Sequence, residues 1–355
     1  MNPLTAARAR ASRLVGFLRR NADIFWWLHS LWALVIGCGV MWLGSRHYGL
    51  LRVAIFQIAF IWVASLVVAT LVEHPVGSSP WAGRVRLVVN YFSRNFYQQL
   101  LFFLLPIYWA SSTFSWNLLF VGFVAVCALL STLDVVYDRH LSVRRSVMAV
   151  FFAFNLFACI NVMLPLLWSI SNVVAIRLSA ALALMAFVTI LCGKRSVAWR
   201  RLVPVTFISA GVLFATVEFA RPLIPPAPLR IVSATFGYDV DRPTMNISNP
   251  VVRVDPGFSG RLYALTAVYA PNGLKDRVGH RWYVNGELVW ASPFHELVGG
   301  RAEGFRLWTG LSLKQVPEGR VRVDVETEGG QLIGRCQVAV AAGPPADAVK
   351  SAVPF

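Results

Sequence analysis

Residues 146–168, SVMAVFFAFNLFACINVMLPLLW, form 23 consecutive positions without a charged side chain. A helix needs about 20 apolar residues to cross roughly 30 Å of hydrocarbon, so this run is long enough to span a membrane. Six further apolar runs lie in the first two-thirds of the chain, at 24–44, 50–72, 96–114, 116–133, 172–192 and 202–220. The sequence therefore predicts a membrane all-α bundle of about seven transmembrane helices over residues 24–220, with a tight helical hairpin at 96–133.

Basic residues are distributed unequally between the connections of these runs. The N-terminal tail, residues 1–23, and the second, fourth and sixth connections together hold 15 Lys and Arg residues, whereas the odd-numbered connections offer only Arg46 and Arg52. The positive-inside rule then places the N-terminus in the cytoplasm, and an odd number of spans places the C-terminus outside.

The formal net charge of +16 has the same origin. A soluble domain with such an excess of positive charge would suggest nucleic-acid binding. Here the excess lies in the tail and the connections, where its direct effect is attraction to anionic lipids of the inner leaflet. We therefore expect the lipid bilayer as a partner and no nucleic acid.

The composition changes after residue 220. Residues 221–229 contain four prolines, which cannot continue a helix and favour a stiff, extended linker. Runs of alternating apolar and polar residues follow at 230–238, 261–270, 280–284, 287–291, 304–313, 320–327 and 331–340. Short strands separated by Gly, Pro and Asn predict an all-β, immunoglobulin-like antiparallel sandwich over residues 230–342. We expect residues 343–355 to form a disordered tail.

The β region resembles a known family through its hairpin motifs. In chain order these are His280-Arg281-Trp282-Tyr283, Asn285-Gly286, Gly304-Phe305-Arg306-Leu307-Trp308-Thr309, Gly319-Arg320-Val321-Arg322-Val323-Asp324-Val325 and Gly334. Asn-Gly suits a two-residue type I′ turn, and residues 321–326 alternate strictly between apolar and charged side chains. The region of about 228–342 resembles the bacterial domain-of-unknown-function family 2914, with one departure at Gly310, where a polar or basic residue is expected.

The N-terminal part is similar in arrangement to the multi-span companion of that family, the domain-of-unknown-function family 5924. The resemblance implies a β-rich module attached to a bacterial membrane protein, and it transfers no catalytic residue. Together with the distribution of basic residues, it places the chain in the bacterial inner (cytoplasmic) membrane, multi-pass, with a cytoplasmic N-terminus and a periplasmic C-terminal domain.

Five residues of the β region form a candidate binding set: His280, Trp282, Tyr283, Arg306 and Trp308. Aromatic rings with an arginine can stack on sugar rings or bind an extended peptide along a sheet edge. The alternative is structural, with Trp282 and Trp308 in the core and with His280 and Arg306 paired with acids on the solvated face. Strand alternation puts Trp282 and Tyr283 on opposite faces, so these two cannot belong to one aromatic row.

Arg177 and Glu218 lie near the same end of the last two apolar runs. Ionised groups within a membrane are expensive and usually pair, so we predict an intramembrane Arg177–Glu218 pair. The pair either joins two helices or lines a ligand path; the further alternative is that both groups extend to the membrane interface.

The sequence has no motif of an enzyme or a metal site. Glu73, His74, Asp134 and Asp138 lie at the cytoplasmic ends of predicted spans, but their spacing is not that of metal ligands or of an acid–base site. Phosphate-binding glycine loops and a GxSxG nucleophile motif are absent from the sequence. We therefore expect no catalytic activity, no cofactor and no metal.

These observations favour a membrane protein that displays a periplasmic β-sandwich as a binding or scaffolding module, with a periplasmic glycan or protein as its partner. The alternative is a transporter or lipid-handling protein whose helical bundle carries the activity. Asn155 and Asn161, with Pro165 in the same run, would then mark a substrate passage. Otherwise these asparagines hydrogen-bond between helices as a packing element.

Overall fold

The computed structural model describes residues 22–46, 100–113, 115–133, 144–192 and 199–342. Contacts divide the chain into two compact units, one made of Met1–Phe103 with Ala125–Phe152 and the other of Leu104–Val124 with Ala153–Phe355.

Several predictions fall outside the described residues. They concern most of the basic tail 1–23, the span 50–72, the cluster of Glu73, His74, Asp134 and Asp138, and the tail 343–355.

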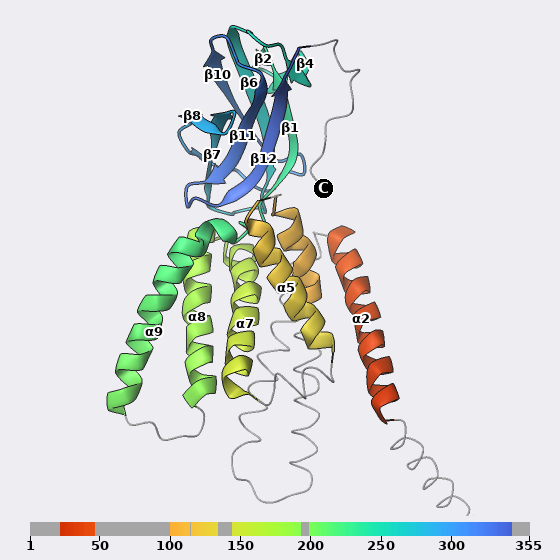
Figure 1. The fold of residues 1–355 in the computed structure, drawn as a ribbon, viewed down its shortest axis with the longest axis vertical. Helices are drawn as coiled ribbons and strands as arrows, with labels where there is room; N and C mark the ends of the chain where they lie inside the picture. Colours follow the sequence, from red (N-terminus) through yellow and green to blue (C-terminus); the bar gives the residue numbers. More distant parts are fainter. Residues whose placement is uncertain (1–21, 47–99, 114, 134–143, 193–198, 343–355) are drawn as a thin grey trace, which may run out of the picture. The chain divides into compact units, whose positions relative to one another are not determined.

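The N-terminal two-thirds of the chain is helical wherever the structure describes it. The helices follow the apolar runs. A helix satisfies its backbone hydrogen bonds internally, and side chains of Leu, Ala, Phe and Met cover it with apolar surface. They are α2 (Ala22–Arg46), a helix at Leu100–Ala110, α5 (Asn117–Thr132), α7 (Arg145–Trp168), α8 (Asn172–Cys192) and α9 (Trp199–Ala220) (Figure 1).

The prediction of seven transmembrane helices is wrong. The described ranges contain six helices, and only one stretch, Ser146–Trp168, is long and apolar enough to cross a membrane, a test based on length and composition alone. Four other apolar stretches have only 10–17 residues. At 1.5 Å per residue, the 16 residues of α5 extend about 24 Å, less than the roughly 30 Å of a hydrocarbon core. One cause is visible in the run 96–114, which continues past the end of the helix at Ala110.

Helices α8 and α9 pack against each other within the second unit. Ala180 and Ala183 of α8 lie in a buried cluster with Val217 of α9, and such small side chains allow close approach of two helices. Much of the remaining surface of α9 is also apolar. Its large exposed side chains are Phe207, Ile208, Val212, Phe214 and Phe219.

The C-terminal region is a β-sheet domain, and each of the seven predicted strands forms within three residues of its expected ends. These strands are β1 (Arg230–Gly237), β6 (Gly260–Tyr269), β7 (Arg277–Val284), β8 (Glu287–Ala291), β10 (Phe305–Leu313), β11 (Gly319–Thr327) and β12 (Leu332–Val340). Five two-residue strands were not predicted, because two residues are too few to show an alternation of apolar and polar side chains. They are β2 (Val240–Asp241), β3 (Asn246–Ile247), β4 (Pro250–Val251), β5 (Arg253–Val254) and β9 (His295–Glu296).

Two sheets form the layers of this domain (Figure 1). One has the strand order β10-β6-β1-β4; the other has the order β5-β12-β11-β7-β8, with β9 also on β7. We call them the four-stranded and the six-stranded sheet. The expectation of purely antiparallel pairing is wrong at one place, because β5 runs parallel to β12. The chain passes from one sheet to the other across the single residue Val252, between β4 and β5.

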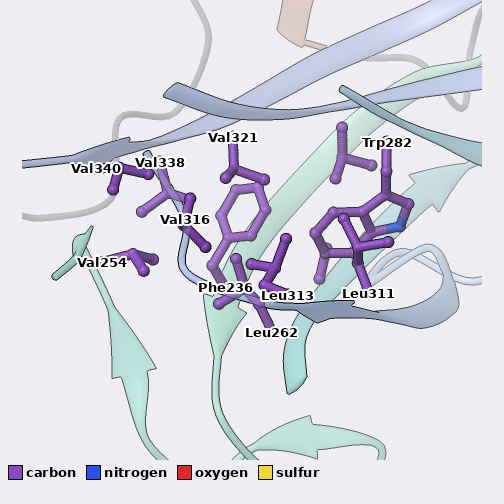
Figure 2. Packing of buried hydrophobic residues seen from close by; sticks show 12 residues of the cluster. Phe236, Val254, Leu262, Trp282, Leu311, Leu313, Val316, Val321, Val338 and Val340 are labelled. Atoms are coloured by element: carbon purple, nitrogen blue, oxygen red, sulfur yellow. The ribbon is translucent and has the colours of Figure 1, made fainter. Parts of the chain in front are cut away.

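The core of the domain lies between the two sheets. Phe236, Leu262 and Leu311 project from the four-stranded sheet toward Trp282 and Val321 of the six-stranded sheet (Figure 2). Face-to-face burial of alternate side chains from two sheets is the arrangement of a β-sandwich.

The proline-rich segment 221–229 folds against the rest of its unit instead of forming an extended linker. A 3₁₀ turn, η3 (Arg221–Leu223), follows α9, and residues 224–229 are buried. Apart from its prolines and Arg221, the segment is composed of Leu, Ile and Ala, so burial removes apolar surface from water.

Substitution Leu262→Ala should lower the stability of the β domain by about 3 kcal/mol, because it empties a fully buried position between the sheets. The measurement is the labelling rate of the partly buried Cys336 thiol in a full-length chain whose other four cysteines are replaced by alanine. The rate should rise by roughly two orders of magnitude. The matched control, Ser312→Ala at an exposed position of β10, should leave it unchanged.

Candidate functional site

The five residues of the candidate binding set occupy three separate environments in the β domain. His280 and Trp282 point into the core, where both are fully buried. Tyr283 lies on the outer face of the six-stranded sheet, and Arg306 and Trp308 lie on the outer face of the four-stranded sheet. The structure therefore brings only Arg306 and Trp308 to one face.

His280 is part of a buried hydrogen-bond network. Its Nε2 lies 2.7 Å from Thr266 Oγ1, and its Nδ1 lies 2.7 Å from Thr309 Oγ1. The Trp282 indole N–H donates to the same Thr309 hydroxyl over 2.8 Å, which leaves the hydroxyl hydrogen for His280 Nδ1 and favours the ring proton on Nε2. The expectation that His280 pairs with an acid on the solvated face is wrong, since its ring is bonded to two hydroxyl groups.

Burial, and to a lesser degree the charge of His295, lowers the pKa of His280 to about 3. The imidazole is therefore neutral at neutral pH, and its function is to satisfy the polar groups inside the sandwich.

On the outer face of the six-stranded sheet, arginines pair with carboxylates of the same face. Asp324 accepts two hydrogen bonds from Arg335, of 2.8 and 2.9 Å. The Arg322 guanidinium lies 4.1 Å from the ring centroid of Tyr283 and covers this residue of the candidate set. The ion pairs of this face are Arg335–Asp324, Arg322–Asp324 and Arg281–Glu326.

The outer face of the four-stranded sheet has a different composition, and we call its group of Arg242, Arg261, Tyr263, Arg306 and Trp308 the arginine–aromatic face. The ring centroids of Tyr263 on β6 and Trp308 on β10 are 5.9 Å apart. Arg261 lies with its Cζ 5.6 Å from the Tyr263 ring centroid, and Arg242 with its Cζ 6.0 Å from that of Trp308. These distances are typical of cation–π contacts.

Gly310 explains how the Tyr263 ring fits on this face. The two residues are direct neighbours in the β10–β6 register, and a Cβ added at Gly310 would lie 2.7 Å from the Tyr263 ring. The departure from the family pattern at this position therefore makes room for the tyrosine.

Arg306 binds backbone and amide oxygens instead of an acid. Its Nη1 donates to Thr244 O over 2.9 Å and to Asn246 Oδ1 over 3.2 Å, and so attaches the β2–β3 connection to the sheet. Among the described residues, Arg242, Arg261 and Arg306 form no ion pair with a carboxylate. The face therefore carries uncompensated positive charge.

A second charged group lies at the ends of α8 and α9. Arg177 Nε donates to Glu218 Oε1 over 2.8 Å, so the structure brings the predicted pair together. Arg221 also pairs with Glu218, through Oε2, and its Nη1 donates to Gly329 O over 3.2 Å. Sequence reasoning missed Arg221, although its i, i+3 spacing from Glu218 is a signal for such a contact. We call Arg177, Glu218 and Arg221 the helix-end cluster.

The β domain is hydrogen-bonded to the helix ends of its own unit. The backbone N–H of Asn172, at the start of α8, donates to Asp276 Oδ2 over 3.3 Å, and its side-chain amide donates to Pro226 O over 3.4 Å. Gln331 Nε2, between β11 and β12, donates to Ile224 O over 2.9 Å. Burial raises the pKa of Asp276, against the lowering effect of its hydrogen bonds. No sequence pattern predicts these contacts, because they join residues 54–107 positions apart.

Asn155 and Asn161 are both buried in α7. Asn161 Nδ2 donates to Tyr108 Oη over 3.2 Å, and this hydroxyl donates to Ala158 O over 2.9 Å. The Oδ1 atoms of both asparagines lack a hydrogen-bond partner. Across the described ranges, His, Cys, Asp and Glu side chains form no group of three or more that could hold a metal ion.

Two family models match the chain. The one described as a family of unknown function (DUF5924) matches residues 4–257, and the one described as a protein of unknown function (DUF2914) matches residues 275–340. These matches confirm both resemblances, but the second begins at 275 and not near 228. A search of curated proteins finds no match.

The pH dependence of stability should reveal the neutral His280. Its pKa of about 3 in the folded chain lies below the ordinary value of 6.5, so the unfolded chain binds a proton first as the pH falls. The contribution of neutral His280 to the free energy of unfolding is complete above about pH 6.5. It declines toward pH 3, by up to roughly 1.4 kcal/mol per pH unit.

Urea unfolding of the full-length chain, followed by circular dichroism between about pH 7.5 and about pH 4.5, measures this effect. The variant His280→Gln should be less stable than wild type at neutral pH but should lose less stability on acidification. Parallel pH profiles for the two proteins would contradict the assignment of a neutral His280.

Proposed function

The chain belongs to the DUF5924 family of unknown function, and this membership assigns no activity. From the residues of the chain, we propose that it is a membrane-anchored, non-catalytic protein whose β domain is a binding or scaffolding module. Its ligand in this proposal is a glycan of the bacterial envelope that carries acidic groups.

The arginine–aromatic face is the observation that carries this proposal. The flat rings of Tyr263 and Trp308 suit the apolar faces of sugar rings, and neighbouring guanidinium groups suit carboxylates or phosphates. The outer face of the six-stranded sheet is less suited, because carboxylates of the chain already pair with its arginines. A protein partner with an acidic segment is the alternative occupant, and the binding measurement below distinguishes the two.

Anchoring in a membrane is supported by the surface of the helices. Large apolar side chains are exposed on α9 and also on α2, where Trp27, Leu28, Leu31 and Trp32 are each more than half exposed. An exposed apolar surface of this kind is costly in water and is suited to lipid.

A cytoplasmic N-terminus and a periplasmic β domain are supported by the charges of the sequence. The tail 1–23, which leads into α2, holds five arginines, and residues 193–201, before and at the start of α9, hold four Lys and Arg, whereas the β domain follows the opposite end of α9. The hydrogen bonds of Asn172 and Gln331 hold the β domain against the helix ends, which suits a module that presents its ligand in a fixed orientation.

Removal of two guanidinium charges from the arginine–aromatic face should weaken binding of an acidic polysaccharide. We expect the double variant Arg242→Gln/Arg261→Gln of the full-length chain to bind immobilised polygalacturonate at least about tenfold more weakly than wild type, since each exposed charge contact contributes about 1 kcal/mol. Trp308→Leu should also weaken binding, including that of a neutral polysaccharide.

The matched control is Lys314→Gln/Arg320→Gln, which removes the same charge elsewhere on the β domain. Equal losses in the two double variants would show that net charge alone attracts the polysaccharide. Binding of an acidic protein segment but of no polysaccharide would replace the glycan by a protein partner.

Fusion proteins test the location of the β domain. Alkaline phosphatase joined after Phe355 should be active, and a fluorescent protein joined at the same residue should be dark, because each reporter matures on one side of the inner membrane only. The reverse result would place the β domain in the cytoplasm and contradict the envelope ligand.

A further inference from the structure

The helix-end cluster has an excess of positive charge. Arg177 and Arg221 share the single carboxylate of Glu218, so two positive charges meet one negative charge. The excess is therefore one positive charge. An uncompensated charge at a surface that adjoins lipid is costly unless an anion accompanies it.

Donor groups of the cluster remain unused. Arg177 uses its Nε on Glu218, and its side chain is 48% exposed, which leaves the outer edge of its guanidinium open. Arg221 directs its two Nη atoms at Glu218 and Gly329 O and its Nε is buried, so the accessible free donors belong to Arg177, and Arg221 contributes its charge. A guanidinium with free N–H groups binds the oxygens of a phosphate well, because its planar donors match two of them at once.

The surroundings of the cluster are apolar. Val174 and Leu178, one turn before and one residue after Arg177 on α8, are 43% and 46% exposed. On α9, Phe214 is 55% exposed with its ring centroid 5.8 Å from Arg177 Cζ, and Phe219 is 87% exposed. The surface thus combines a cationic group with an apolar border, as the surface around a lipid headgroup requires.

We propose that Arg177, Glu218 and Arg221 form a binding site for the phosphodiester of an anionic lipid, whose acyl chains lie on the exposed apolar side chains of α8 and α9. One excess positive charge matches the single negative charge of such a headgroup. Glu218 holds the two guanidinium groups in place and sets this charge. The inference rests on the membrane anchoring proposed above and is independent of the arginine–aromatic face.

The test uses the full-length chain in a neutral detergent and native mass spectrometry with three probes: phosphatidylglycerol, phosphatidylcholine and inorganic phosphate. Phosphatidylglycerol should bind at least about tenfold more tightly than phosphatidylcholine, whose positive choline opposes the cluster. Inorganic phosphate should bind weakly, since it has no acyl chains. Equal binding of inorganic phosphate and phosphatidylglycerol would make the site a phosphate site and overturn the lipid assignment.

Variants of the two partners should act in opposite directions. Arg177→Gln removes the excess charge and should lower the affinity for phosphatidylglycerol about tenfold or more, whereas Arg177→Lys should retain most of it. Glu218→Gln raises the excess to two charges and should maintain or increase the affinity, although it removes the ion pairs. If the cluster only joined the helices, Arg177→Gln and Glu218→Gln would change lipid binding in the same direction, and the proposal would be wrong.

The control variant is Arg277→Gln, which removes a half-exposed arginine that pairs with Glu328. Lipid affinity should be unchanged in it. If the wild-type chain remained in carbonate-washed membranes but showed no preference for phosphatidylglycerol, the lipid site would be wrong and the membrane anchoring would stand. Release of the wild-type chain from such membranes would overturn the membrane anchoring of the proposed function.

Discussion

One buried side chain, Asn172, joins three parts of the chain that are distant in sequence. It begins α8, its backbone amide donates to Asp276 of the β domain, and its side-chain amide donates to Pro226 in the segment after α9. A buried amide is costly unless its polar atoms are bonded, so this arrangement favours one relative position of its partners. The helix-end cluster and the folded proline segment occur together because these elements meet there.

Most long strands of the β domain were predictable because they have one face in the core and the other in solvent, whereas β8 is exposed at every residue and was predictable from the Asn285-Gly286 turn before it. In residues 321–326 this alternation is complete, and β11 forms over it with Val321, Val323 and Val325 inside. The helical part was less predictable. Apolar residues indicate burial or lipid contact, but they do not indicate where a helix ends. The predicted run 96–114 is therefore longer than its helix, which ends at Ala110. The proline segment was misinterpreted for a similar reason: composition excluded a helix but did not distinguish an extended linker from a buried turn.

The candidate site was partly predictable for the same physical reason. Arg306 and Trp308 share one face because they are two positions apart on a strand, and so do Arg261 and Tyr263, which the sequence analysis did not select. The charged Arg281 lies between His280 and Trp282, and this position already indicates that these two face the core. Arg242 could not be found in this way, because it lies between two-residue strands and reaches Trp308 only through the fold of the chain.

The position of β6 affects how the two matched families can be combined. This strand lies between β1 and β10 in the four-stranded sheet, yet its residues lie between the segments that match the two family models. Exchange of either segment by recombination near residues 257–275 would leave β1 and β10 from different parents to pair with the same central strand. The two segments have separate family descriptions, but strands from both pair with β6, so an exchanged segment would still have to match this strand.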